Sequence, residues 1–136
     1  MKILILGCGR QGAYLAQSLD QQGHAVTIID RNAASFRRLG PDFKGTVIAG
    51  VGIDEDVLRR AGIESADAFI AVTNGDNTNA MAAEIARLVF NVPQVIARLY
   101  DPAREETYRS LEMFATVCPT VMGATHITEL LTGKKG

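Results

Sequence analysis

The sequence has too few cysteines to be held together by disulfide bonds, with only two among its 136 residues. The lack of a disulfide framework excludes most small secreted scaffolds and fits a reducing cytosol. No apolar stretch approaches the roughly 18 residues that a membrane-spanning helix needs. The apolar run at 3–6 is followed by Gly-Cys-Gly-Arg instead of a cleavage site, so we expect neither a signal peptide nor direct insertion into a membrane.

The chain also lacks an excess of charge of either sign, because 14 basic residues face 15 acidic ones and the net charge is −1. Without a strong positive field, we expect no binding to nucleic acid or anionic lipid. The basic pairs Arg37-Arg38, Arg59-Arg60 and Lys134-Lys135 are predicted to lie on solvated helix faces and in the tail. Repeats and low-complexity linkers are absent too. One domain of this size can bury about two thirds of its unfolded surface.

Metal sites and catalytic sets are missing as well. The two histidines, His24 and His126, lie far apart and have no cysteine or acid at metal-ligand spacing. No Ser/His/Asp or Cys/His set can be justified. Cys8 lies at a predicted helix N-terminus, which can lower the pKa of a thiol, but a small filler residue is the favoured interpretation over a redox role. We therefore expect no metal and no catalytic residue.

The most informative stretch is 2–12, KILILGCGRQG, in which an apolar run leads into Gly7-x-Gly9-x-x-Gly12. Gly7 allows a sharp turn at the end of a strand, Gly9 allows a pyrophosphate to approach, and Gly12 allows the next helix to lie close to the sheet. Phosphate oxygens can then accept from the free N–H groups of that helix. The motif predicts a phosphate-binding turn.

Two neighbouring features strengthen this prediction. The helix after the turn is expected to bury Tyr14, Leu15 and Leu19 on one face. The segment AVTIID ends in Asp30, 18 residues after Gly12, where the second strand of a nucleotide-binding βαβ unit offers an acid to a ribose diol. This acid disfavours a 2′-phosphate and indicates NAD or an ATP-like ligand over NADP. The alternative role for Asp30, capping a helix, suits Asn32 equally well.

Short apolar runs alternate with helical segments along the whole chain, which is typical of a parallel sheet covered on both faces. Strands are predicted at 2–6, 25–30, 45–49, 68–72, 94–99 and 116–118. Helices are predicted at 11–22, 33–39, 55–61, 77–90, 104–111 and 120–131. The predicted fold class is α/β, a Rossmann-like, doubly wound parallel sheet of six strands in the order 3-2-1-4-5-6. Ligands bind such sheets outside the carboxyl ends of the strands, at the switch point between strands one and four.

The residues after each strand are therefore candidates for the site. They are the glycine turn, Asp30-Arg31, 50–52, 73–76 and Arg98 onward. Arg10, inside the glycine turn, is favoured as a phosphate contact over an exposed arginine at a helix start. Arg98 ends a buried strand, where an unpaired charge is costly, and this implies a phosphate or an acidic partner.

Thr73 and Asn74 have short polar side chains that suit the floor of a nucleotide site. The competing interpretation is a turn followed by a helix that Asp76 or Asn77 caps, and both can hold together.

These residues together resemble the RCK/KTN family of regulators of potassium conductance, in its N-terminal nucleotide-binding (TrkA-N) domain. The matching segments are GCGRQG, HAVTIID, DAFIAVTNGDNTN and VIARLYDP. The resemblance implies a cytosolic subunit or domain that binds ATP, ADP, AMP or NAD(H). It also implies that homodimers, assembled into a ring, open or close a membrane potassium channel or transporter.

Carried over by position, the resemblance assigns phosphate binding to the glycine turn, Arg10 and Arg98, ribose binding to Asp30, and the adenosine side to Thr73-Asn74. The full predicted site consists of Gly7, Cys8, Gly9, Arg10, Gln11, Gly12, Asp30, Arg31, Gly50, Val51, Thr73, Asn74, Gly75, Asn77 and Arg98. Val51 departs from the family, whose members often carry an acid there, and this puts adenine contacts at that edge in question.

The resemblance also divides the chain into a nucleotide-binding domain, 1–118, and a crossover helix with a polar tail, 119–136. The crossover helix is expected to pack on a neighbouring subunit through an apolar face. The C-terminal ligand-binding domain of the family is absent from this sequence, so we expect either a truncated chain or a single-domain form.

Two alternatives to a regulatory binding module remain. An NAD-dependent oxidoreductase would need a second domain with a substrate pocket and a proton donor, which 136 residues do not supply. The second alternative is an NAD(H) redox sensor without a potassium partner, which the sequence alone hardly distinguishes from a regulatory binding module. We predict a binding protein and not an enzyme.

Overall fold

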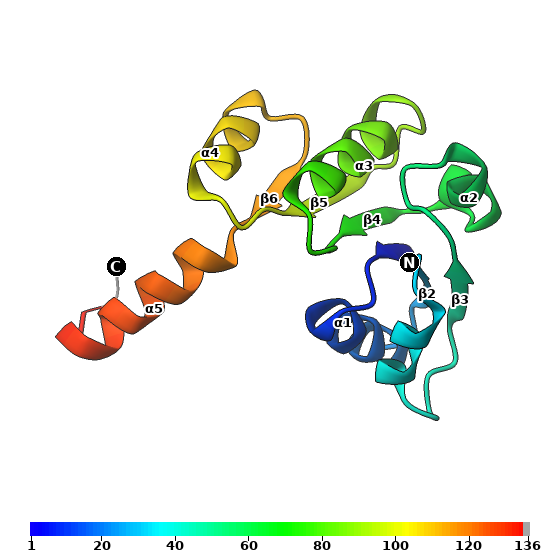
Figure 1. Cartoon of the computed structure of the whole chain (residues 1–136), viewed down its shortest axis with the longest axis horizontal. Coiled ribbons are helices and arrows are strands. Elements are labelled where there is room, and N and C mark those ends of the chain that lie inside the picture. Colours follow the sequence, from blue (N-terminus) through cyan, green and yellow to red (C-terminus); the bar gives the residue numbers. More distant parts are fainter. Residues whose placement is uncertain (135–136) are drawn as a thin grey trace.

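Six parallel strands form the centre of the protein in the computed structural model, which describes residues 1–134 (Figure 1). The sheet order is β3-β2-β1-β4-β5-β6. The strands are β1 (Lys2–Leu6), β2 (Ala25–Asp30), β3 (Thr46–Ala49), β4 (Ala68–Ala71), β5 (Gln94–Arg98) and β6 (Ala115–Val117). The predicted Rossmann-like fold class and strand order are confirmed. The end of the predicted polar tail, residues 135 and 136, lies outside the described residues.

The helices follow the strands as predicted, with ends shifted by one or two residues. They are α1 (Arg10–Gln21), η1 (Ala33–Leu39), α2 (Glu55–Arg60), η2 (Ile63–Ser65), α3 (Asp76–Leu88), α4 (Pro102–Leu111) and α5 (Pro119–Thr132). Two differences concern type. The segment 33–39 is a 3-10 helix, and the short 3-10 helix at 63–65 was not predicted.

Alternate residues of β1 enter two separate cores. Leu4 and Leu6 of β1 pack on the side covered by α2 and α3. Ile3 and Ile5 pack on the side covered by α1 and η1. These contacts fix the carboxyl ends of β1, β2 and β4 next to one another, and this edge of the sheet is where the candidate site lies.

The glycine motif has the steric role that the sequence predicts. Gly7 has a positive φ of 109°, and a Cβ there would lie 2.7 Å from the carbonyl oxygen of Val72. A Cβ on Gly12 would overlap the carbonyl of Gly7. Larger residues at either position would push α1 away from the sheet.

Two packing predictions are wrong. Tyr14 is 77% exposed, because α1 lies so close to the sheet that the small residues Gly12, Ala13 and Ala16 face it instead. One position after Ala13, the helix has turned by about 100°. The strand β3 is not covered on both sides, since it is an edge strand and Val47 is exposed.

The last helix, α5, projects away from the rest of the molecule (Figure 1), and none of its residues is buried. Its exposed apolar side chains are Val121, Met122, Ile127, Leu130 and Leu131. Within residues 1–134, no helix has both the length and the apolar character that a bilayer crossing requires.

Candidate functional site

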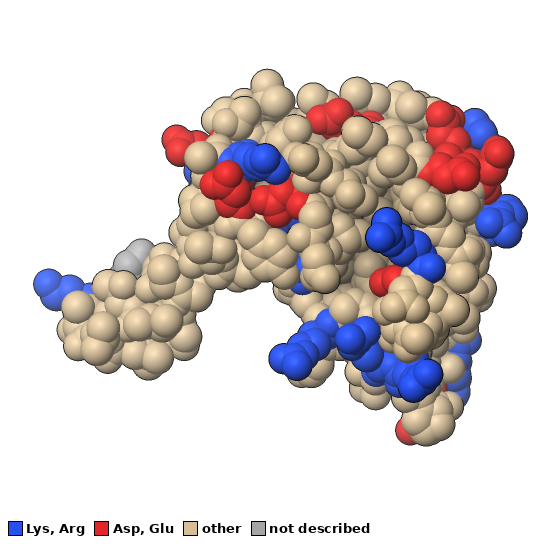
Figure 2. All heavy atoms as spheres, in the orientation of Figure 1, with Lys and Arg blue, Asp and Glu red and all other residues tan. Residues whose placement is uncertain are grey.

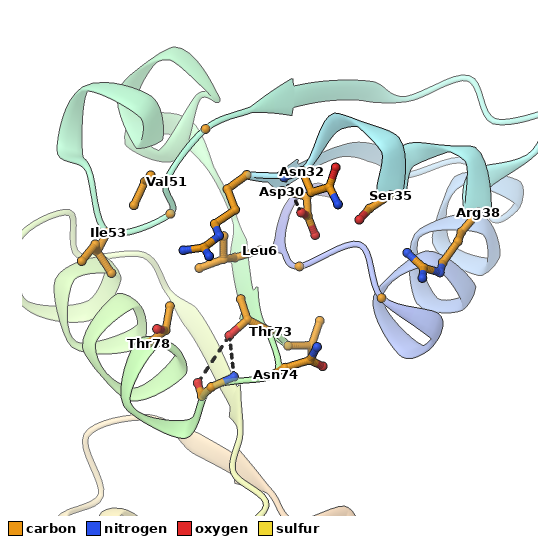
Figure 3. Close-up of a pocket in the computed structure, with 17 residues that line it drawn as sticks. Leu6, Asp30, Asn32, Ser35, Arg38, Val51, Ile53, Thr73, Asn74 and Thr78 are labelled. Carbon is orange, nitrogen blue, oxygen red and sulfur yellow. Dashed lines mark hydrogen bonds between the residues drawn. The ribbon is translucent and has the colours of Figure 1, made fainter.

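A cleft of about 560 Å³ opens at the carboxyl ends of β1, β2, β3 and β4 (Figure 3). Its volume is within the range of small-molecule sites. The residues that line it are Leu6, Gly7, Gly9, Asp30, Arg31, Asn32, Ser35, Arg38, Gly50, Val51, Gly52, Ile53, Val72, Thr73, Asn74, Gly75 and Thr78. This is the switch-point position that the strand order predicts for a ligand.

The glycine turn forms one wall of the cleft. Gly9 is the N-cap of α1 and makes no side-chain cap, so the first N–H groups of this 12-residue helix have no side-chain acceptor. A Cβ built on Gly9 would meet no atom within 4 Å. The turn therefore leaves room for a phosphate in front of the helix, and the residues present fit such a group.

Asp30 lies at the end of β2 and points into the cleft (Figure 3). Its Oδ2 accepts a hydrogen bond from Cys8 N and its Oδ1 accepts one from Asn32 N, both at 2.8 Å. Each carboxylate oxygen has a further lone pair, so both can still accept from a hydroxyl. Asn32 is the residue that caps the next helix, accepting from Ala34 N at 3.1 Å.

Cys8 is fully buried beneath the turn. The pKa of its thiol is raised to about 11, chiefly by burial and also by the nearby charge of Asp30, while the charge of Arg38 acts in the opposite direction. This direction is opposite to the one expected from a helix N-terminus. The thiol donates to the carbonyl oxygen of Ser35 at 3.4 Å. Cys8 therefore has the character of a small buried residue and lacks that of a reactive thiol.

Thr73 lines the cleft and is held from behind by a residue that was not predicted from the sequence. Asn79 of α3 is fully buried. Its Oδ1 accepts from Thr73 N at 2.9 Å and from Thr73 Oγ1 at 2.6 Å. Its Nδ2 donates to Thr73 O at 3.0 Å and to Arg98 O at 2.8 Å. The sequence does indicate that Asn79 is buried, because it lies at helical spacing from Ala83 and Ala86 and so belongs to the apolar face of α3.

Arg98 does not line the cleft, and its partners are different from those predicted. It is only 5% exposed, and burial lowers its pKa. Its Nη1 donates to Gln11 Oε1 at 2.7 Å, and its Nη2 donates to the carbonyl oxygens of Val72 and Thr73, both at 2.9 Å. The guanidinium also lies 4.7 Å from the ring centre of Tyr100. Oxygens of Gln11, Val72 and Thr73 and an aromatic face therefore surround the guanidinium. The charge of Asp76 favours the protonated form, and Nε is buried without a hydrogen-bond partner among residues 1–134.

Nine of the predicted site residues line the cleft: Gly7, Gly9, Asp30, Arg31, Gly50, Val51, Thr73, Asn74 and Gly75. Six lie outside its lining: Cys8, Arg10, Gln11, Gly12, Asn77 and Arg98. Cys8, Gly12 and Arg98 are buried next to the cleft, and the exposed Gln11 accepts a hydrogen bond from Arg98. Arg10 is the first residue of α1 and is exposed.

The predicted caps of α3 are wrong. The N-cap of this helix is Gly75. Asp76 instead accepts from the backbone N–H groups of Tyr100, at 2.8 Å, and Asp101, at 3.0 Å. The Oδ1 of Asn77 accepts from Arg104 Nη1 at 2.7 Å. Asp76 thus ties the start of α3 to the segment after β5, and Asn77 ties it to α4. Neither residue lines the cleft.

The cleft also contains side chains that the sequence analysis did not assign to it: Leu6, Asn32, Ser35, Arg38, Ile53, Val72 and Thr78. Arg38 is exposed on a helix, as predicted, but its Nη1 also donates to Cys8 O at 3.2 Å, a contact that was not predicted. Val51 and Ile53, both exposed, form an apolar end of the cleft (Figure 3). Basic side chains gather over α1 and η1 (Figure 2). Within residues 1–134, no group of three or more His, Cys, Asp or Glu residues could hold a metal ion.

Comparison with known sequences gives a consistent family. Residues 3–119 match the sequence profile of the TrkA-N domain. The chain is 57% identical over 111 residues to the Trk system potassium uptake protein TrkA of Streptomyces coelicolor. This alignment covers 82% of the chain and 50% of the relative, so the chain spans about half the length of that protein.

Solved structures that are similar to this chain include RCK domains. The GsuK RCK domain superposes with a TM-score of 0.81 at 26% identity, over 99% of this chain and 29% of that one. The structure of GsuK bound to ADP gives the same TM-score and identity, over 97% of this chain and 34% of that one.

Proposed function

This chain belongs to the TrkA-N domain family, and we propose that it binds an adenine nucleotide in the cleft and thereby regulates a membrane potassium channel or transporter. The observation that carries the proposal is the cleft itself, which lies at the switch point between β1 and β4 and brings an acid at the end of β2 next to a glycine turn. The similarity to a TrkA protein and to an ADP-bound GsuK structure supports the choice of ligand and of partner.

In this proposal each wall of the cleft holds one part of the nucleotide. The N–H groups at the start of α1 donate to the phosphates. Asp30 accepts hydrogen bonds from the ribose hydroxyls, which an ATP, ADP, AMP or NAD(H) ligand all offer. Val51 and Ile53 supply apolar surface for the base. Thr73, fixed by Asn79, closes the floor. Arg10, Asn77 and Arg98 take no part in this scheme within one chain.

We propose that two copies join through α5, with residues 1–118 as the nucleotide-binding unit and 119–136 as crossover helix and tail. Higher-order assembly into a ring and attachment to the cytoplasmic face of a membrane partner belong to the same proposal. Binding of nucleotide moves a gate only by the difference in its affinity for the two states of the assembly. The function proposed is therefore regulatory and involves no turnover of the nucleotide.

Calorimetric titration with ATP, ADP, AMP, NAD⁺ and NADH tests this proposal, and a nucleotide retained through purification can be identified by mass spectrometry. We expect Asp30→Ala to weaken every ligand by about 10-fold or more, because a charged acceptor for the ribose hydroxyls is lost. Asp42→Ala, which removes an exposed acid away from the cleft, is the matched control and should leave the affinities unchanged.

Equal affinities for wild type and Asp30→Ala would refute the ribose assignment. Absence of binding to all five ligands would refute the proposal as a whole. Chromatography of the nucleotides after long incubation separates the regulatory proposal from an enzymatic one, since steady conversion of any of them would contradict it.

A further inference from the structure

Arg38 is the basic residue of the cleft that touches the glycine turn. It lies in the last turn of η1, and its Nη1 donates to the carbonyl oxygen of Cys8 at 3.2 Å. Figure 3 shows Arg38 and Ser35 reaching from η1 toward the turn, on the same side of the cleft as Asp30. The residue was not expected there, because it is eight positions beyond the end of β2.

The backbone around Arg38 is fixed in place. Gln17 of α1 donates from Nε2 to Arg38 O at 3.1 Å and to Leu39 O at 2.8 Å. Leu39 is buried in the core beneath α1. The end of η1 is therefore held against the helix whose N-terminus faces the cleft, and the position of Arg38 relative to the glycine turn does not depend on a free loop.

The charge of Arg38 has no acidic partner in the described chain. None of the ion pairs among residues 1–134 includes it. Asp30, the carboxylate that lines the same cleft, uses its oxygens on the backbone N–H groups of Cys8 and Asn32. The bond to Cys8 O occupies one of the five guanidinium donors. Several donors and a full positive charge remain for an anion beside the turn.

Arg10 lacks these features. It lies inside the glycine motif, but it does not line the cleft. We propose that Arg38, in place of Arg10, binds the phosphate groups of a nucleotide held in the same chain, and thereby makes the cleft select nucleotides over nucleosides. This inference rests on the proposed function, since it assumes that the cleft holds an adenine nucleotide.

Arg38→Gln and Arg37→Gln form a matched pair, because they remove the same charge from adjacent exposed positions of η1 and only Arg38 lines the cleft. Calorimetric titration with ADP and with adenosine is the measurement. We expect Arg38→Gln to lower the affinity for ADP by about 10-fold to 100-fold, which is the effect of losing a charge-assisted hydrogen bond. The affinity for adenosine should not change. Arg38→Lys should recover part of the ADP affinity, whereas Arg37→Gln should resemble the wild type.

The outcomes separate this inference from the proposal beneath it. An unchanged ADP affinity in Arg38→Gln, or an equal loss for ADP and adenosine, would overturn the role of Arg38 and leave the nucleotide proposal intact. A wild-type chain that binds none of ATP, ADP, AMP, NAD⁺ and NADH would overturn both. Thermal unfolding of each variant shows whether the fold is preserved, and we expect unfolding temperatures close to that of the wild type, since Arg38 and Arg37 are exposed.

Discussion

At the scale of single residues, the backbone of Cys8 binds two charged side chains of the cleft, Asp30 and Arg38. Asp30 accepts from its N–H at 2.8 Å and Arg38 donates to its carbonyl at 3.2 Å. Both polar groups of one backbone unit are thus satisfied by oppositely charged side chains. This arrangement fixes the glycine turn while it keeps the two charges from pairing with each other.

The pKa of Cys8 gives a prediction at this scale. With a thiol pKa of about 11 in the folded chain, alkylation by iodoacetamide should be slow at pH 8. Its rate should rise about tenfold per pH unit up to pH 10 without levelling off, because the thiolate is the nucleophile. Peptide mapping separates Cys8 from Cys118. In urea the rate should level near pH 9, the ordinary value, and the same levelling in the folded protein would contradict the prediction.

The raised pKa of Cys8 also determines how the stability of the fold changes with pH. Because the folded pKa lies above the unfolded one, the folded state holds its proton more tightly. The resulting contribution to stability is fully present below pH 9 and is lost as the pH rises toward 11.

At the scale of elements, two buried polar side chains join the strands and helices around the floor of the cleft. Asn79 connects α3 to Thr73 and to the end of β5. Arg98 connects β5 to the segment after β4 and to α1 through Gln11. Arg98 O accepts from Asn79, so the two side chains belong to one network. The segment after β4 is held on both sides, although it contains no regular structure.

Asn79→Ala should therefore destabilise the fold. The substitution removes the acceptor of the Thr73 N–H and the Asn79 donor to the carbonyl of Arg98, and it leaves the carbonyl of Thr73 with Arg98 as its donor. We expect this loss to cost about 2 to 4 kcal/mol in the free energy of unfolding. Urea unfolding measures it. Asn74→Ala is the control, because Asn74 is exposed and its loss should change the stability by less than about 0.5 kcal/mol. Equal effects of the two variants would show that the network does not stabilise the fold.

At the scale of the whole molecule, the sequence predicts the sheet and the position of the cleft for a simple reason. Buried parallel strands are continuous apolar runs, and the residues that follow them must meet at one edge. Asp30, Thr73 and the glycine turn follow from this rule.

The residues that were misassigned depend on contacts between distant segments. Arg38 enters the cleft because Gln17, in another helix, holds the end of η1. Arg98 lies at the correct edge of the sheet, but its side chain turns behind the cleft to the carbonyls of Val72 and Thr73. Linear spacing places Arg98 near the site but leaves open on which side of its wall the side chain lies, and it gives no reason to place Arg38 in the site.

The helix α5 supports the last prediction, which concerns assembly. A helix of 14 residues with no buried side chain is marginal in water on its own, because most helical stability comes from packing an apolar face. Ile127 and Leu130 are three positions apart on one face and are 59% and 72% exposed. Under the proposed dimer, Ile127→Glu with Leu130→Glu places two carboxylates in the contact.

We expect this double variant to be a monomer at concentrations where the wild type is a dimer. The dissociation constant of the dimer should rise by about 100-fold or more, because two large apolar side chains lose their burial. Sedimentation velocity measures the change. Thr125→Glu, which adds one carboxylate on another face of the same helix, should remain dimeric. The interface would lie elsewhere if the double variant dimerised like the wild type. A wild type that is monomeric throughout would contradict the dimer proposal, because α5 would then be exposed in the working molecule.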